Sequence, residues 1–139
     1  MRVYLDSSAL VKRGIDEDSS EDLEAALLTF DPQSCYASSL AWVEVSRTLR
    51  SRLEHADPAL VVDLIELSLS AIHEVSFSPH VVSYARRIGS PWLRSLDAIH
   101  IASATVVDAE LFVAYDRRLL GVASEMGFRT LSPGATIRS

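Results

Sequence analysis

Four acidic residues spread along the chain have the neighbours expected of metal ligands. Asp6 and Asp116 each follow an apolar run directly. Glu44 stands between two valines, and Asp97 between a leucine and an alanine. Carboxylates crowded together repel one another, whereas a hard divalent ion binds them through oxygen and neutralises them. Because magnesium and manganese suit such ligands, the four acids predict a divalent-metal site if the fold brings them together.

Each of these acids also has an ordinary structural explanation. Asp97 or Asp116 could cap a helix. Glu44 could form a surface ion pair with Arg13 or Arg47. The joint placement of the four acids, more than any one of them, therefore favours a functional site.

Two of the acids end strands that the sequence predicts. Val3–Leu5 is a short apolar run that stops at Asp6, and the run over 111–115 stops at Asp116. In open parallel sheets the ligand site lies outside the carboxyl ends of the strands. If both strands are central in the sheet, the topology places Asp6 and Asp116 at the ligand site.

The rest of the chain alternates strands with helices. Further strands are expected at 35–37, 72–75 and 129–131. Helical spacing and capping signals predict one helix that begins at residue 9. They predict further helices over 23–30, 40–53, 58–67, 79–88, 96–104 and 117–124. The two over 40–53 and 58–67 should form a hairpin. The fold class is α/β, a three-layer α/β/α sandwich with a mainly parallel central sheet, formed by residues 1–139 as one domain.

Polar residues near the acids have two interpretations each. Ser7 and Ser8 offer hydroxyls that could cap the helix from residue 9, and capping is the only role expected for Ser7. His100 lies three residues after Asp97, near enough to support a site on the same helix face, but we expect it to pack in the core. The other histidines share no ligand spacing with one another or with Cys35, which argues against zinc.

The net charge of −6 argues against a protein that holds nucleic acid through an overall basic surface. Local charge matters more, and twelve of the thirteen basic residues are arginines, which bind phosphate through two parallel hydrogen bonds. The candidates for phosphate contacts flank the acidic motifs, although a solvated role suits each equally: Arg13, Arg94, Arg117 and Arg118.

The sequence shows no secretory or membrane signal. No apolar run approaches the roughly 18–20 residues that span a bilayer, and an acid appears within the first six positions. A lone Cys35 provides no disulfide framework. We therefore expect a cytoplasmic protein.

Two other function classes fit the sequence poorly. A phosphoacceptor signalling domain needs paired acids at the first strand and a late lysine, but Asp6 is followed by serines and Lys12 is the only lysine. Nucleotide-binding glycine motifs of the G-x-G-x-x-G and G-x-x-x-x-G-K-[ST] types are absent from the sequence.

Four runs that contain the acids together resemble a known family. They are Leu5–Lys12, Ser39–Val45, Leu96–Ala102 and Tyr115–Leu119. In this order and spacing they resemble PIN-domain ribonucleases, and more narrowly the VapC-type toxins of bacterial toxin–antitoxin pairs. The resemblance covers essentially the whole chain.

The resemblance implies an activity, which is Mg²⁺-dependent endonucleolytic cleavage of RNA, with Mn²⁺ as a substitute. It also implies a cognate antitoxin and a homodimer as partners. A non-catalytic PIN-fold module that binds RNA or protein is the alternative.

The same resemblance assigns roles by position. It places the acidic quartet at Asp6, Glu44, Asp97 and Asp116. Ser8 would support the ion's water or a substrate phosphate, and Glu44 would be either a ligand through water or a base. Arg117 and Arg118 stand where further acids are sometimes found, so a second ion would be poorly held.

Overall fold

The computed structural model describes residues 1–135 and forms the expected α/β/α sandwich. Its strands are β1 (Val3–Leu5), β2 (Cys35–Ser38), β3 (His73–Val75), β4 (Leu111–Val113) and β5 (Arg129–Leu131). They form one parallel sheet in the order β3-β2-β1-β4-β5. Its helices are α1 (Ser7–Gly14), α2 (Ser20–Leu27), the short 3₁₀ turn η1 (Pro32–Ser34), α3 (Ser39–Arg52), α4 (Pro58–Leu69), α5 (Pro79–Ala85), α6 (Ser95–Val106) and α7 (Arg117–Glu125).

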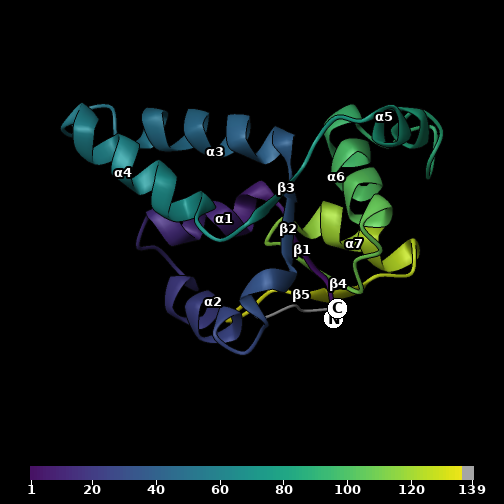
Figure 1. Cartoon of the computed structure of the whole chain (residues 1–139), viewed down its shortest axis with the longest axis horizontal. Helices are drawn as coiled ribbons and strands as arrows, with labels where there is room; N and C mark the ends of the chain where they lie inside the picture. The colour runs from purple at the N-terminus through teal and green to yellow at the C-terminus, as the bar shows by residue number, and fades with distance from the viewer. Residues whose placement is uncertain (136–139) are drawn as a thin grey trace.

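The central strands are buried on both faces. Val3 and Leu5 point to one face and Tyr4 to the other, because side chains alternate along a strand. Figure 1 shows α1, α3 and α4 on one side of the sheet and α5, α6 and α7 on the other. The helices bury Leu10, Leu23, Ala41 and Leu49 against the first face, and Val81, Ile101, Leu119 and Ala123 against the second. Two cores therefore hold β1 and β4 from opposite sides.

The predicted hairpin of α3 and α4 is confirmed, and α1 packs against both helices. Arg13, near the end of α1, donates two hydrogen bonds of 2.9 Å to the carbonyl oxygens of Ser68 and Ser70. Gly14 follows where α1 packs tightly against α4, since an added Cβ would lie 2.9 Å from the Leu64 carbonyl oxygen. Arg13 thus holds the hairpin against α1. It is neither the phosphate contact nor the partner of Glu44 that the sequence allowed.

Some elements end earlier than the sequence predicts. The strand expected to reach Tyr115 ends at Val113, because the Tyr115 N–H donates to the Ser8 hydroxyl at 2.9 Å and not to a neighbouring strand. The helices expected to reach residues 30 and 88 end at Leu27 and Ala85, where turns with shorter hydrogen-bond spacing follow. The early end of β4 places Asp116 two residues farther from the strand than expected.

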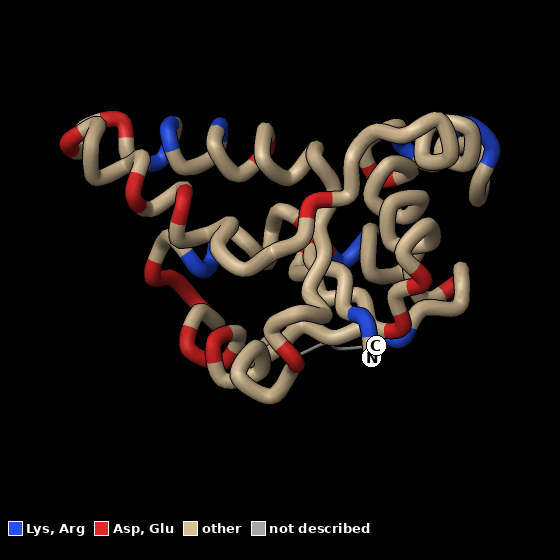
Figure 2. The backbone as a smooth tube through the Cα atoms, in the orientation of Figure 1, with Lys and Arg blue, Asp and Glu red and all other residues tan. Residues whose placement is uncertain are grey.

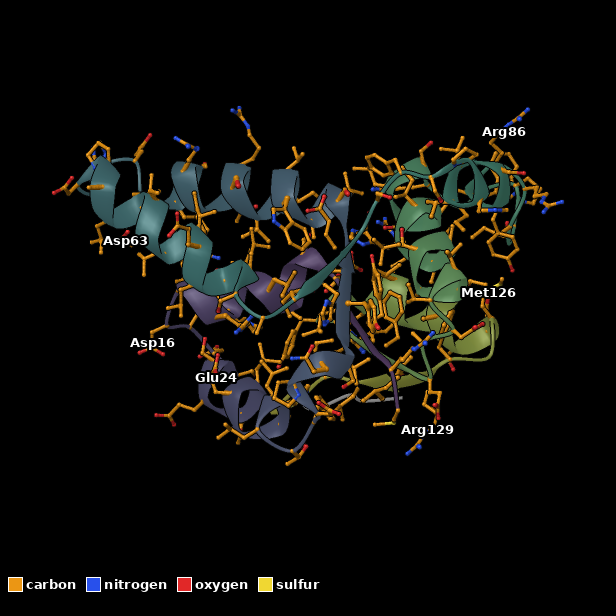
Figure 3. The ribbon with its side chains drawn as sticks, viewed as in Figure 1. Asp16, Glu24, Asp63, Arg86, Met126 and Arg129 are labelled. Carbon is orange, nitrogen blue, oxygen red and sulfur yellow. The ribbon has the colours of Figure 1, made fainter. Side chains whose placement is uncertain are left out.

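Much of the negative charge lies in the loop after α1 and the first half of α2. Residues 16–24 contain six acids, which Figure 2 shows as a red stretch at the lower left. Figure 3 shows the Asp16 side chain pointing away from the protein. Glu17 is neutralised by Lys12 at 3.2 Å and Arg52 at 2.7 Å. Within residues 1–135 no helix is long and apolar enough to cross a membrane.

Candidate functional site

Asp6 joins β1 to α1 and is fixed by both. Its Oδ1 accepts the Ala9 N–H at 3.1 Å and the Ser8 hydroxyl at 2.7 Å, and its own N–H donates to the Val113 carbonyl oxygen at 3.2 Å. The prediction that Ser7 and Ser8 cap α1 is wrong, because Asp6 has the extended backbone of the N-cap and accepts the first-turn N–H. A carboxylate also interacts favourably with the positive end of the helix dipole.

Asp116 repeats this arrangement at the junction of β4 and α7. Its Oδ1 accepts the N–H groups of Arg118 at 3.0 Å and Leu119 at 3.2 Å, so the predicted cap is confirmed. Because β1 and β4 are parallel neighbours, Asp6 and Asp116 lie at the same edge of the sheet. Capping uses one oxygen of each carboxylate and leaves the other for a ligand.

Ser8 connects the two junctions. Its hydroxyl donates to Asp6 Oδ1 at 2.7 Å and accepts the N–H of Tyr115, the residue before Asp116, at 2.9 Å. The proton and one lone pair of the hydroxyl are therefore already used. In this structure Ser8 holds Asp6 in place and ties it to the end of β4.

Asp97 lies in the first turn of α6 and is buried. The alternative that it caps this helix is excluded, because Arg94 occupies the N-cap and makes no side-chain cap bond. Arg118 Nη2 lies 3.2 Å from Asp97 Oδ2, but the two are not aligned as a hydrogen bond, and Oδ2 is buried without one. A buried carboxylate oxygen without a donor is costly, which makes it a ready position for a cation.

Glu44 reaches the site from α3 and is held by two donors. Its Oε1 accepts the Ser7 hydroxyl at 2.6 Å and bonds His100 Nε2 at 2.8 Å. Burial raises the pKa of Glu44, but the hydrogen bonds from His100 and Ser7 outweigh it and bring the pKa below its ordinary value. The alternative explanation of Glu44, a surface ion pair with Arg13 or Arg47, does not apply, because Ser7 and His100 hold this carboxylate.

These side chains line one cavity of about 740 Å³. The acids of the predicted quartet are all in its wall, together with Ser7, Ser8 and His100. Its basic lining residues are Lys12, Arg52, Arg94 and Arg118. Of the predicted phosphate contacts, Arg94 and Arg118 are thus at the cavity, whereas Arg13 and Arg117 are not. The cavity offers oxygen ligands and cations side by side.

The pKa of Asp6 is raised to about 6, first because the carboxyl is buried and also because Asp116 is near. His100 and the hydrogen bonds from Ser8 and Ala9 lower the pKa, but by less. Within the described residues no three acidic, histidine or cysteine side chains are gathered tightly enough to bind an ion as they stand. At Asp97 the charge is balanced by Arg118.

Residues 3–125 match the model of the PIN domain. The chain belongs to the PIN domain family. It is 36% identical over 137 residues to Ribonuclease VapC47 of Mycobacterium tuberculosis, covering 96% of this chain and 98% of the relative. It is 34% identical over 133 residues to Ribonuclease VapC46 of the same organism, covering 94% and 97%. The expected membership among the VapC ribonucleases is therefore confirmed.

Solved structures agree with the fold. The M. tuberculosis toxin VapC20, described as cleaving the sarcin–ricin loop, superposes with a TM-score of 0.71 at 15% identity, covering 94% of this chain and 99% of that one. FitAB bound to an IR36 DNA fragment gives a TM-score of 0.64 at 16% identity, covering 98% of each chain. At these identities the likeness concerns the PIN fold alone.

The sequence did not identify every residue at this PIN-domain site. Ser7 was assigned to capping and His100 to packing, yet both contact Glu44. The spacing of His100 from Asp97 was a usable signal, since residues three apart share a helix face. Tyr4 lies in β1 and bonds His100. Its only sign in the sequence was the alternation along the strand, which places it on the opposite face of the sheet from Val3 and Leu5.

Proposed function

We propose that this PIN-domain protein is a Mg²⁺-dependent endoribonuclease and the toxin of a type II toxin–antitoxin pair. The observation that carries the proposal is that acids from four separate segments line one cavity: Asp6, Glu44, Asp97 and Asp116. The VapC relatives, which align over nearly the whole chain, are named ribonucleases. Hydrolysis of an RNA phosphodiester bond is the reaction that fits this combination.

The proposed ligands of the ion are Asp6, Asp97 and Asp116. Their oxygens are hard donors suited to Mg²⁺, with Mn²⁺ as a substitute, and the buried Asp97 Oδ2 lacks a hydrogen bond. A bound divalent ion would lower the pKa of water and polarise a phosphoryl oxygen. Binding requires Arg118 to leave Asp97, because the guanidinium now balances that charge.

The protein's own groups would position the reactants. The caps and Ser8 hold Asp6 and Asp116 before substrate arrives, which avoids reorganisation during the reaction. Glu44, whose lowered pKa keeps it ionised, would accept the proton of the attacking water. The water oxygen bonds to phosphorus while the bond from phosphorus to the leaving ester oxygen breaks, and that oxygen takes a proton from solvent. Arg94 and Arg118 would contact the phosphate.

The proposed partners are a cognate antitoxin and a second copy of the chain, acting in the cytoplasm, with residues 1–139 as one domain. Apolar side chains on α4 support a dimer, since Leu60, Val62 and Leu67 are 50%, 44% and 51% exposed. One tightly held ion is favoured over two, because the residues after Asp116 are arginines.

Mapping of RNA ends tests the proposed activity. We expect the purified protein to cut RNA internally in Mg²⁺, to stop in EDTA, and to resume when Mg²⁺ or Mn²⁺ is returned. The Asp97→Asn variant should not cut RNA, because it lacks the anionic oxygen, now 3.2 Å from Arg118, that we propose as a ligand of the ion. Sequencing of RNA ends after induced expression, compared with the same variant, would identify the substrate. RNA binding by the wild type with no new ends in any divalent ion would instead support the non-catalytic module.

Arg118→Ala is expected to separate ion binding from RNA binding. Removing the guanidinium that competes at Asp97 should tighten Mn²⁺ binding by about fivefold, because a nearby cation disfavours a second one. The same change should weaken RNA binding by about tenfold, because a phosphate contact is lost. Calorimetry with Mn²⁺ and fluorescence anisotropy with a labelled RNA measure the two effects.

A matched control for Arg118→Ala is Arg86→Ala. Arg86 is exposed at the end of α5, and Figure 3 shows it pointing away from the protein. Its removal subtracts the same charge and should leave both affinities unchanged. Equal effects of the two variants would mean that net charge, and not the contact with Asp97, controls binding.

A further inference from the structure

His100 forms a bridge between the core and the cavity. Its Nδ1 lies 2.7 Å from the hydroxyl oxygen of Tyr4, and its Nε2 lies 2.8 Å from Glu44 Oε1. Tyr4 is fully buried in β1, and its ring meets the imidazole edge-on, with centroids 6.0 Å apart and planes at 71°. The imidazole is itself buried, so its orientation is set by packing as well as by these two hydrogen bonds.

The partners determine where the imidazole protons lie. The Glu44 carboxylate oxygen can only accept, so a neutral His100 imidazole carries its proton on Nε2 and donates it to Glu44. Its Nδ1 then accepts the phenolic proton of Tyr4, whose oxygen accepts the Ser38 N–H at 3.1 Å. A protonated imidazole also carries a proton on Nε2. The hydrogen bond to Glu44 is therefore the same in either charge state, whereas the opposite tautomer would place a lone pair against a carboxylate.

Both donors on Glu44 reach the same oxygen. The Ser7 hydroxyl and His100 Nε2 bond Oε1, and within residues 1–135 no protein donor reaches Oε2. The Glu44 side chain is 30% exposed, in the wall of the cavity. One carboxylate oxygen is thus held while the other remains available to water or substrate.

We propose that His100 is a positioning residue that, braced by Tyr4, holds Glu44 Oε1 so that Glu44 Oε2 faces the reacting water in the cavity. This inference rests on the proposed nuclease function, since it assigns a task to Glu44 in that reaction. It extends the site to residues outside the acidic quartet. Ser7 has the second holding contact from the first turn of α1.

A double-mutant cycle tests whether His100 acts through Glu44. His100→Leu keeps a side chain of similar size but removes the donor, and kcat should fall by about 30-fold with KM for RNA changed less than twofold. His100→Gln retains a donor near the Nε2 position and should recover most of kcat. In a Glu44→Ala background, His100→Leu should cause no further loss, because the oxygen that it positions is gone.

The proposal is contradicted if His100→Leu lowers kcat by the same factor in the Glu44→Ala background as in the wild type. A lower melting temperature with unchanged kcat in the folded variant would likewise assign His100 to packing alone. His80→Leu, an exposed histidine in α5, is the control for loss of a histidine and should change neither kcat nor KM.

An NMR measurement tests the inference without cleavage, so its failure is distinct from a failure of the nuclease proposal. In the metal-free protein, long-range ¹H–¹⁵N spectra should show a proton on His100 Nε2, with the signal assigned by its loss in His100→Gln. Tyr4→Phe removes the hydroxyl that fixes the ring and should reduce the Nε2–H population and lower kcat by about tenfold. A neutral wild-type ring with its proton on Nδ1, or a Tyr4→Phe variant with unchanged spectra and kcat, overturns the proposal.

Discussion

Asp6→Asn is expected to abolish RNA cleavage, by about a thousandfold or more, and at the same time to make the metal-free protein more stable. Asn keeps the shape of the side chain, and its Oδ1 can still accept from Ala9 N–H and the Ser8 hydroxyl, so the cap of α1 survives. The anionic oxygen needed by a divalent ion is lost. The fold gains because a buried charge near Asp116 is removed.

The stabilisation should depend on pH in a defined direction. The pKa of Asp6 is about 6 in the folded protein against an ordinary 3.8, so the folded state binds its proton more tightly than the unfolded state. The carboxylate therefore lowers stability fully above pH 6, by about 3 kcal/mol, and the cost disappears as pH falls below 4. Asp6→Asn should gain that amount at pH 7 and nearly nothing at pH 3.5.

Urea unfolding in EDTA at the two pH values measures the effect, with Asp63→Asn as the control. Asp63 is exposed on α4, and Figure 3 shows it pointing away from the protein, so its replacement should change neither stability nor cleavage. If Asp6→Asn is less stable than the wild type at pH 7, the buried Asp6 carboxylate does not lower stability as described above. If it still cuts RNA at the wild-type rate, Asp6 is not a ligand.

Gly14→Ala is expected to cost about 3 kcal/mol of stability, although alanine is ordinarily the better helix former. The new Cβ would lie 2.9 Å from the Leu64 carbonyl oxygen and 3.1 Å from Leu49 Cδ1, and closer still to Ser68 Oγ. Ser68 is fully buried and Leu64 contributes a backbone atom, so neither can move away cheaply. The α3–α4 hairpin would have to separate from α1, which carries the Asp6 cap.

Gly121→Ala is the matched control, because Gly121 lies inside α7 with nothing within 4 Å of an added Cβ. It should stabilise the protein by up to about 1 kcal/mol, the ordinary helix preference. Urea midpoints compare the two variants. Adding Ser68→Ala to Gly14→Ala should recover part of the loss, and a Gly14→Ala midpoint equal to that of the wild type would show that α1 and α4 are not in tight contact.

The sequence alone determined the fold class and the identities of the four acids. Short apolar runs separated by amphipathic helical segments favour a parallel sheet, because parallel strands need long crossover connections, which are usually helices. Asp6 and Asp116 follow such runs directly, so the edge at which they meet follows from local pattern and topology together. The helix pair α3–α4 was equally predictable, since the Asp57-Pro58 start signal follows the first helix closely.

Only the tertiary structure decided which side chains hold these acids. The contacts that fix Glu44 join residues 37 and 56 positions apart, and the contact of Tyr4 with His100 joins residues 96 apart. Hydrogen bonds act over about 3 Å, so a serine, a histidine or a tyrosine carries no local sign of a partner that distant in the chain. Packing of α6 against β2 and α3, with His100 of α6 against Tyr4 of β1, brings these groups together and supports the proposed positioning of Glu44.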